Sequence, residues 1–306
     1  DPPTDSTPAS SSEGWSPIQG AFWRAGGIAP GLELKDVLPR FTGEAIAVIE
    51  NHGRGTSPPD QPLFLYLAYP APHTPWLPSP EFQGKSGAGM YGDFIMMVDD
   101  QISRVLSALE ESGMAENTLL IFSSDNGPVW YDADVERFGH DASGGLRGMK
   151  GDAWEGGHRM PFIVRWPGVV EEGSVSGQTI AFMDILATMA DVTGIPVTDK
   201  ENLDSHSFLS VLMGDQPEGQ PIRPSLVMES AGGAMAIRAG DWKLIDRLGS
   251  GGFSEPRYVE PGPGDPAGQL YNLAEDPGET KNLYSENPEV VERLTRDLEK
   301  VVAETY

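Results

Sequence analysis

The spacing of apolar residues predicts helices alternating with short buried strands in the first half of the chain. Over 42–51 and 91–112 apolar residues recur every three or four positions, which is typical of one buried face of a helix. Two continuous apolar runs, 63–69 and 118–123, each have the length of a buried strand. This strand, helix, strand order is typical of a parallel sheet.

Two further elements of the same kind follow. A third buried strand is expected at 161–166, after a long glycine-rich connection. A helix is expected at 184–192 and should end before Gly194, because glycine readily adopts the left-handed conformation that closes helices. The chain is then polar until about residue 220.

The pattern beyond residue 220 changes to short strands at 225–229, 234–238 and 242–246, separated by turns that contain glycine. Such strands are expected to pair antiparallel. A final helix is predicted to start with Asn287 as N-cap and Pro288 at the first helical position. We expect it to pack on the small sheet through Val290, Val291, Leu294, Leu298, Val301 and Val302.

These patterns together predict an α/β fold with a mostly parallel sheet flanked by helices. A small α+β subdomain of antiparallel strands and one long helix is expected at 215–306. Residues 1–27 should be poorly ordered or irregular, since the start of this segment is rich in Pro, Ser and Thr and carries few apolar groups. The main domain is then expected to span 28–214.

Composition excludes several classes of function. Acidic residues outnumber basic ones 46 to 21, and the net charge of -25 makes nucleic acid a poor partner. The absence of cysteine excludes disulfides, thiolate nucleophiles and cysteine-bound zinc. No run approaches the roughly 20 apolar residues of a membrane span, and no export signal is visible at the start of the sequence.

The segment 123–127, Ser-Ser-Asp-Asn-Gly, directly follows a predicted buried strand. In open parallel sheets, ligands bind at the carboxyl ends of the strands. Asp125 and Asn126 offer hard oxygen ligands, which suit calcium or magnesium rather than zinc or copper. The alternative is an Asx turn at Asp125, with Gly127 at positive φ.

A second candidate is His73, which lies in a proline-rich loop after the predicted strand at 63–69. Pro70, Pro72 and Pro75 should make this loop stiff, which suits a group that must be aimed at a ligand. His73 is expected at the same sheet edge as Asp125, where it could bind an anionic ester oxygen or protonate a leaving group. The alternative is a histidine in a surface loop.

The third candidate is the glycine-rich stretch 144–151, followed by 155–161. Glycines allow the backbone to approach a ligand closely, and Arg147 and Lys150 supply positive charge in an acidic chain. The stretch therefore fits an anion-binding loop, although it does not match the GxxxxGK[ST] pattern of nucleotide-binding loops. The alternative is a flexible connection.

Taken in this order, the three segments resemble the later part of the sulfatase family, within the alkaline phosphatase superfamily. FLYLAYPAPHTPW resembles the family's strand and histidine loop, SSDNG its second metal-ligand motif, and LRGMKGDAWEGGHRMPFIVRWPG its lysine loop and following strand. AIRAGDWKLI and LYNLAEDPGETKNL are similar to its closing subdomain. The resemblance runs from about residue 28 to the end and implies an incomplete alkaline phosphatase-like sheet.

The resemblance implies a sulfuric ester hydrolase that acts on a sulfate ester or a sulfated glycan. Carried over position by position, Asp125 and Asn126 would bind the calcium ion, while His73 and Lys150 would contact the sulfate and its leaving oxygen. The resemblance also implies export to the periplasm or beyond. His158 and Arg159 are expected to serve loop structure, and His140 receives no role.

The chain departs from the family where the nucleophile belongs. Sulfatases carry an earlier Cys/Ser-x-Pro/Ala-x-Arg motif whose first residue becomes formylglycine, and this sequence has no cysteine. The stretch 254–257 has the wrong spacing. The family's opening aspartate pair, its motif arginine and an additional Lys and His pair are also missing. We therefore expect half of a site, in a chain that is inactive alone.

Two alternatives stay open from the sequence. A phosphatase or phosphonate hydrolase of the same superfamily would carry Asp-His at the metal motif, so Asn126 disfavours it. A noncatalytic anion-binding scaffold would keep the basic loop without a nucleophile.

Overall fold

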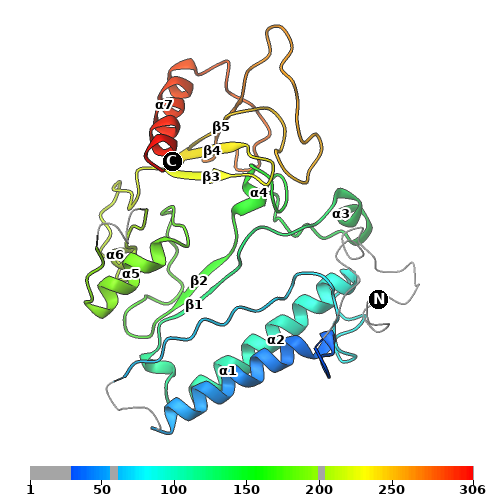
Figure 1. Cartoon of the computed structure of the whole chain (residues 1–306), viewed down its shortest axis with the longest axis vertical. Helices are drawn as coiled ribbons and strands as arrows, with labels where there is room; N and C mark the ends of the chain where they lie inside the picture. Colours follow the sequence, from blue (N-terminus) through cyan, green and yellow to red (C-terminus); the bar gives the residue numbers. More distant parts are fainter. Residues whose placement is uncertain (1–28, 56–60, 199–203, 306) are drawn as a thin grey trace. The chain divides into compact units, whose positions relative to one another are not determined.

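The computed structural model describes residues 29–55, 61–198 and 204–305 (Figure 1). The irregular segment expected at 1–27 lies outside these residues. The chain divides into two compact units, which are described separately: Asp1–Thr118 with Trp130–Asp141, and Leu119–Val129 with Ala142–Tyr306.

Two long helices dominate the first unit and run alongside one another (Figure 1). Both helices predicted from apolar spacing are confirmed, as α1, Val37–Gly53, and α2, Gly89–Glu111. The predicted face of α1 is buried through Ala45 and Ile49, and α2 buries Phe94, Met97, Val98, Ala108 and Leu109. Short helices complete the unit: η1, Leu34–Asp36, η2, Ala115–Asn117, and α3, Asp132–Phe138.

The prediction of a buried strand at 63–69 is wrong. The segment forms no strand, and its side chains Phe64 and Tyr66 are 79% and 82% exposed. A strand needs a hydrogen-bonding neighbour, and none of the strands in the described part of the chain pairs with this segment. Its end is tethered to α1, because the hydroxyl oxygens of Tyr69 and Thr42 lie 2.8 Å apart.

The second unit opens with a two-stranded sheet. Both predicted strands are confirmed, as β1, Leu120–Ser123, and β2, Phe162–Arg165, but they pair antiparallel with Leu120 opposite Arg165. The expected parallel arrangement is therefore not formed by the strands that the structure describes. A parallel pair needs a crossover, usually a long helix. The only helices between β1 and β2 are α3 and the four-residue α4, Glu155–His158.

The helix expected at 184–192 is confirmed as α5, Asp184–Thr193, and ends at Gly194 with φ 68°. The short helix α6, Leu209–Leu212, follows it. Asp184 is fully buried, and its Oδ1 accepts a hydrogen bond from Arg223 Nη2 at 2.8 Å. This buried charge pair ties the start of α5 to the segment that leads into the next sheet.

A four-stranded antiparallel sheet forms the last part of the second unit, with strand order β3-β4-β5-β6. The three expected strands are confirmed as β3, Leu226–Glu229, β4, Met235–Ala239, and β5, Trp242–Ile245. The fourth strand, β6, Gln269–Asn272, was not anticipated. The final helix is confirmed as α7, Pro288–Thr305.

The predicted packing of α7 on this sheet is also confirmed (Figure 1). One hydrophobic cluster joins the helix to strands β4, β5 and β6: Val291, Leu294 and Leu298 with Ile237, Leu244 and Leu270. Each fully buried aliphatic side chain of this kind contributes about 2 kcal/mol. The four-stranded sheet and α7 thus share a core of their own.

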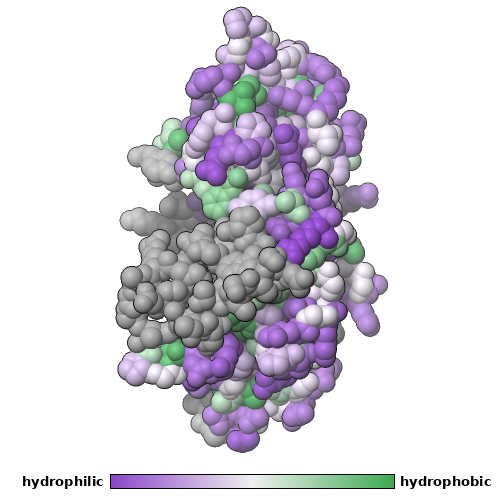
Figure 2. Space-filling view, turned by 90° about the vertical axis from the view of Figure 1, so that its right-hand side faces the viewer, coloured by the Kyte–Doolittle hydropathy of each residue, from purple (hydrophilic) through white to green (hydrophobic). Residues whose placement is uncertain are grey.

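Among the residues that Figure 2 colours by hydropathy, most are hydrophilic, and apolar residues are scattered between them. Such a surface agrees with the acidic composition. Among the described helices, none combines the length and apolar character that crossing a membrane requires.

Candidate functional site

The predicted metal-binding turn follows β1 after a single residue. Asp125 is exposed there, and the Asn126 amide donates through Nδ2 to the Gly127 carbonyl at 2.9 Å. This bond leaves Asn126 Oδ1 as an acceptor beside the Asp125 carboxylate. The pair therefore offers only oxygen ligands, as a hard cation requires. In the described residues no group of three or more His, Asp or Glu side chains could hold a metal ion.

Gly127 is required by close packing rather than by a left-handed turn. Its φ is not positive, so the alternative Asx turn with Gly127 at positive φ is not formed. A Cβ built on Gly127 would lie 1.8 Å from the Gly156 carbonyl oxygen, far inside any tolerable contact. The Gly127 amide also donates to the Gly157 carbonyl at 3.0 Å. The turn and the glycine-rich stretch are thus packed backbone against backbone.

Lys150 is held beside the same turn. Its amide donates to the Pro128 carbonyl at 2.8 Å, and the next residue, Gly151, accepts a hydrogen bond from the Ala231 amide at 2.8 Å. The Lys150 side chain is half-buried, and its Nζ forms no hydrogen bond or ion pair with the residues that the structure describes. Its positive charge is therefore available to a ligand.

Asp152 gives the loop around Lys150 its shape. The carboxylate is buried and accepts three backbone hydrogen bonds: from Met149 at 2.8 Å, Phe253 at 2.6 Å and Ser254 at 3.0 Å. Charge-assisted bonds of this kind are roughly twice as strong as neutral ones. They fix the lysine loop, defined as residues 147–157, to the segment that follows β5.

Two of the predicted site residues line one cavity of about 300 Å³. The walls come from the turn after β1, the lysine loop, and the end of β3 with the residues after it. The lining residues include Asn126, Lys150, Asp152, His158, Met228, Glu229 and Ala231. The structure therefore brings Asn126 and Lys150 together, with Asp125 exposed beside Asn126.

The two remaining histidines singled out by the sequence belong to the first unit. His73 is exposed, and its Nδ1 donates to the Thr74 carbonyl at 2.8 Å. Lys150 belongs to the second unit, and the approach of His73 to Lys150 stays a prediction. His140 is exposed as well, and its carbonyl accepts a hydrogen bond from Trp130 Nε1 at 2.7 Å.

A largely buried charge network, Glu155, His158, Lys243 and Glu279, reaches the cavity through His158. Lys243 is fully buried, and its Nζ lies 3.0 Å from Glu155 Oε1 and 3.0 Å from Glu279 Oε1. The backbone amide of Glu155 donates to Glu279 Oε2 at 2.6 Å. One ammonium therefore holds two buried carboxylates together.

Burial by itself raises the pKa of the Glu155 carboxyl, but contacts with His158 and Lys243 outweigh it and hold that pKa well below its usual range. Burial raises the pKa of Glu279, against the opposing charge of Lys243. Burial lowers the pKa of His158; the bond to Glu155 opposes this shift, and Lys243 reinforces it. His158 Nε2 lies 3.3 Å from Glu155 Oε1 and 3.4 Å from Lys243 Nζ; a protonated Nε2 donates to Glu155, whereas an unprotonated Nε2 accepts from the Lys243 ammonium.

Sequence reasoning gave no role to Glu155, Lys243 or Glu279. One signal was present, because Lys243 stands inside a predicted strand with Trp242 and Leu244 on either side. A lysine at such a position needs a buried partner. The partners themselves lie 88 and 36 residues away in the sequence, where no local pattern marks them.

We expect the free energy of unfolding to fall as the pH drops below about 6.5, the ordinary pKa of histidine. The pKa of His158 is lowered in the fold, so the unfolded chain binds its proton first, and stability is lost between the ordinary and the lowered pKa. Urea denaturation of a His158→Gln variant between pH 5 and 7.5 should show a flatter profile. His140→Gln, at an exposed position, should keep the slope; equal slopes in all three proteins would contradict the assignment.

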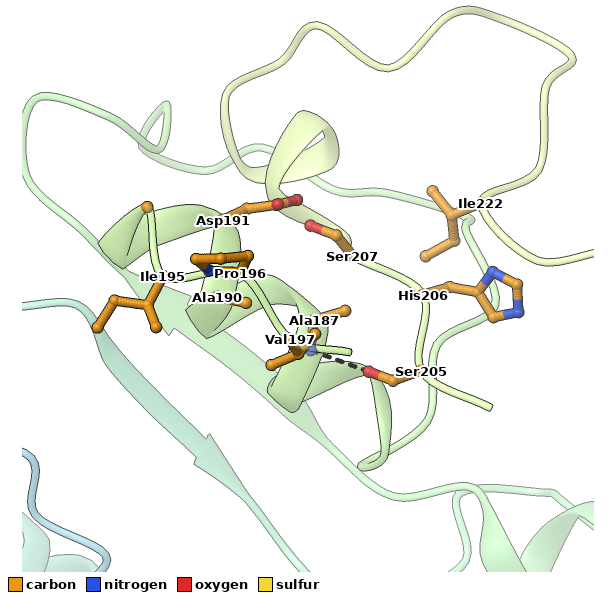
Figure 3. Close-up of a pocket in the computed structure, with 11 residues that line it drawn as sticks. Ala187, Ala190, Asp191, Ile195, Pro196, Val197, Ser205, His206, Ser207 and Ile222 are labelled. Carbon is orange, nitrogen blue, oxygen red and sulfur yellow. Dashed lines mark hydrogen bonds between the residues drawn. The ribbon is translucent and has the colours of Figure 1, made fainter. Parts of the chain in front are cut away.

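A larger cavity of about 580 Å³ lies beside the C-terminal end of α5 (Figure 3). Asp191 and His206 line it but lie on opposite sides in Figure 3, and one hydrogen bond is drawn among the lining residues, from the Ala187 amide to Ser205 Oγ at 2.9 Å. Among its described lining residues, Asp191 and His206 share no hydrogen bond.

Comparison with solved structures defines the class of the fold. A structure described with glycosaminoglycan metabolism by Bacteroides thetaiotaomicron matches 88% of this chain and 55% of its own, with a TM-score of 0.76 and 34% sequence identity. A sulfatase from a Pseudoalteromonas species has the same fold, with a TM-score of 0.72 over 90% of this chain and 55% of its own at 24% identity. The expected alkaline phosphatase-like α/β class is confirmed.

The sequence model of the sulfatase family matches residues 40–195, and the chain belongs to that family. Among curated relatives, N-acetylgalactosamine-6-O-sulfatase of Bacteroides thetaiotaomicron is 34% identical over 284 residues, which cover 91% of this chain and 53% of the relative. Human arylsulfatase A is 32% identical over 256 residues, which cover 77% and 48%. The chain thus spans about half the length of these relatives.

Proposed function

We propose that this chain forms one wall of the site of a sulfuric ester hydrolase. Lys150 contacts the sulfate and its leaving oxygen, and Asp125 and Asn126 contribute to a calcium site, or a magnesium site. The observation that carries the proposal is the shared cavity of about 300 Å³, which Asn126 and Lys150 line at the end of β1. His73 is the proposed donor to the leaving oxygen from the other unit.

The chemistry of these residues follows from their types and surroundings. Lys150 has an uncommitted ammonium, which can stabilise negative charge on the ester oxygen as the S–O bond breaks. Asp125 and Asn126 fit part of a calcium shell, since both offer oxygen and calcium takes about 6–8 such ligands. A bound calcium ion would supply further positive charge to the sulfate oxygens.

The chain alone is proposed to be inactive, because no residue stands in the position of the family's nucleophile. The sequence has no cysteine and no serine in a Ser-x-Pro/Ala-x-Arg motif, so formylglycine has no precursor here. In this proposal 28–214 is the C-terminal part of the catalytic domain, and 215–306 is its closing subdomain. The alternative of a noncatalytic anion-binding scaffold shares the same basic loop and differs in turnover.

The proposed substrate is a sulfated sugar. The relative with 34% identity over 91% of this chain is named N-acetylgalactosamine-6-O-sulfatase, and a solved structure at 25% identity holds a neocarrahexaose. Sulfated glycans lie mainly outside cells, which supports export to the periplasm or beyond. Asn126 and the family match both favour a sulfatase over a phosphatase or phosphonate hydrolase.

Binding of inorganic sulfate and calcium to the purified chain tests the proposal. We expect weak, salt-sensitive sulfate binding that falls about tenfold in Lys150→Ala, since one charge-assisted contact is lost. Lys85→Ala, which removes an exposed lysine of the first unit, should bind as the parent does. Calcium binding should be weaker than micromolar and lost in Asp125→Ala. Calorimetry that finds submicromolar calcium binding in Asp125→Ala would contradict the metal assignment.

A further inference from the structure

Glu229 places a negative charge on the same cavity as Lys150. It is the last residue of β3, it is exposed, and it lines the cavity together with Lys150 and Asn126. Its carboxylate forms no hydrogen bond or ion pair with any residue in the described ranges, Lys150 included. Asp152, the other carboxylate in the lining, is already bonded to three backbone amides, so Glu229 is the lining carboxylate left to meet a ligand beside Lys150.

The backbone that carries Glu229 is fixed relative to Lys150. The Ala231 amide donates to the Gly151 carbonyl at 2.8 Å, which joins the segment after Glu229 to the residue after Lys150. Ser230 is buried, and its Oγ donates to the Gly251 carbonyl at 2.8 Å. Binding a ligand therefore requires the Glu229 side chain to be ordered, but not the backbone that carries it.

A carboxylate beside a sulfate site changes the affinity of the site in opposite directions for different ligands. It repels a bare sulfate ion, so it weakens binding of any ligand that presents sulfate alone. It strengthens binding of a ligand that brings hydroxyl groups, because an ionised carboxylate accepts strong hydrogen bonds from them. A site built in this way rejects an analogue that lacks the donor.

We propose that Glu229 selects the substrate by accepting hydrogen bonds from sugar hydroxyls close to the sulfate group. The cavity of about 300 Å³ is large enough for one monosaccharide ring. Its volume is at the lower end of the range found for ligand pockets. The inference rests on the proposed sulfatase function and deepens it. It makes a sulfated sugar the preferred ligand over an aryl sulfate of the same charge.

The test compares three ligands on the 306-residue chain by NMR titration: N-acetylgalactosamine 6-sulfate, 4-nitrophenyl sulfate and inorganic sulfate. Glu229→Gln should lower affinity for the sugar sulfate about tenfold, the value of one hydrogen bond to a charged group. It should not lower affinity for the other two ligands. Glu292→Gln, an exposed position on α7, is the matched control and should leave all three affinities unchanged.

The outcomes separate this inference from the function on which it rests. If Lys150→Ala weakens binding of all three ligands while Glu229→Gln leaves sugar binding intact, selection by Glu229 is overturned and the sulfate site stands. Equal losses for all three ligands in Glu229→Gln also overturn it. If Lys150→Ala leaves sulfate binding unchanged, or if the parent chain binds no sulfate, the proposed function fails and selection by Glu229 fails with it.

Discussion

Replacing Lys243 by methionine is expected to cost about 3–5 kcal/mol of unfolding free energy, the usual effect of removing one partner of a buried ion pair. Lys243 is fully buried, and its Nζ lies 3.0 Å from both Glu155 and Glu279. Methionine fills a similar volume but leaves two carboxylates facing each other without their cation. Arg238, 3.5 Å from Glu155 Oε2, compensates only that carboxylate. Urea denaturation at pH 7 measures the loss.

The chain offers a matched control on its surface. Lys281 and Glu286 form an ion pair of 2.9 Å with side chains 65% and 57% exposed. Lys281→Met should change stability by less than about 1 kcal/mol, because water already solvates both charges. If the unfolding free energy of Lys243→Met lies within about 1 kcal/mol of that of the parent chain, the Lys243 ammonium does not stabilise the fold by holding Glu155 and Glu279 together.

Hydrolysis of 4-nitrophenyl sulfate is expected to require an N-terminal segment joined to this chain. The 306-residue chain should show no hydrolysis above background, because its sequence has no cysteine and no serine in the family's nucleophile motif. The same residues fused to an N-terminal sulfatase half that carries the nucleophile motif should turn the ester over. In that fusion, Lys150→Ala should lower kcat/KM by about 100-fold, as removal of one group that stabilises transition-state charge does.

Lys85→Ala in the fusion is the control and should retain the parent kcat/KM, since this lysine is exposed and belongs to the first unit. Hydrolysis by the unfused chain that disappears in its Lys150→Ala variant would show a nucleophile within these 306 residues. A fusion that binds sulfate without turnover would favour the noncatalytic scaffold.

Local patterns were sufficient for elements whose burial is decided by their own sequence. The helix α7 followed from Pro288 at its start and from apolar spacing, and Leu294 is indeed fully buried against the sheet. The segment 63–69 shows the opposite case. Its apolar run predicts a strand, but a strand also needs a neighbour, and a sequence run cannot state whether one is present.

In the candidate site, too, some residues could be predicted from local sequence and others could not. Asn126 and Lys150 could be named from their motifs, because a residue pair after a strand and a cation among glycines are local signals. Glu229 and Asp152 could not, since their positions in the cavity depend on hydrogen bonds between segments about 80 to 100 residues apart. Gly127 was expected at positive φ only in the alternative of an Asx turn, whereas the structure requires glycine there because Gly156 lies against it.

The bonds that hold the lysine loop also determine when it can form during synthesis. The Glu155 amide binds a carboxylate 124 residues further along the chain, and the Asp152 carboxylate binds amides about 100 residues ahead of it. At about 5–20 residues per second, a ribosome completes the missing partners roughly 6 to 25 seconds after it has made the loop. Until then the glycine-rich segment around Lys150 lacks the hydrogen bonds that shape it, and a nascent chain that stops before Glu279 contains Asp125, Asn126 and Lys150 without the carboxylate that holds the Glu155 amide.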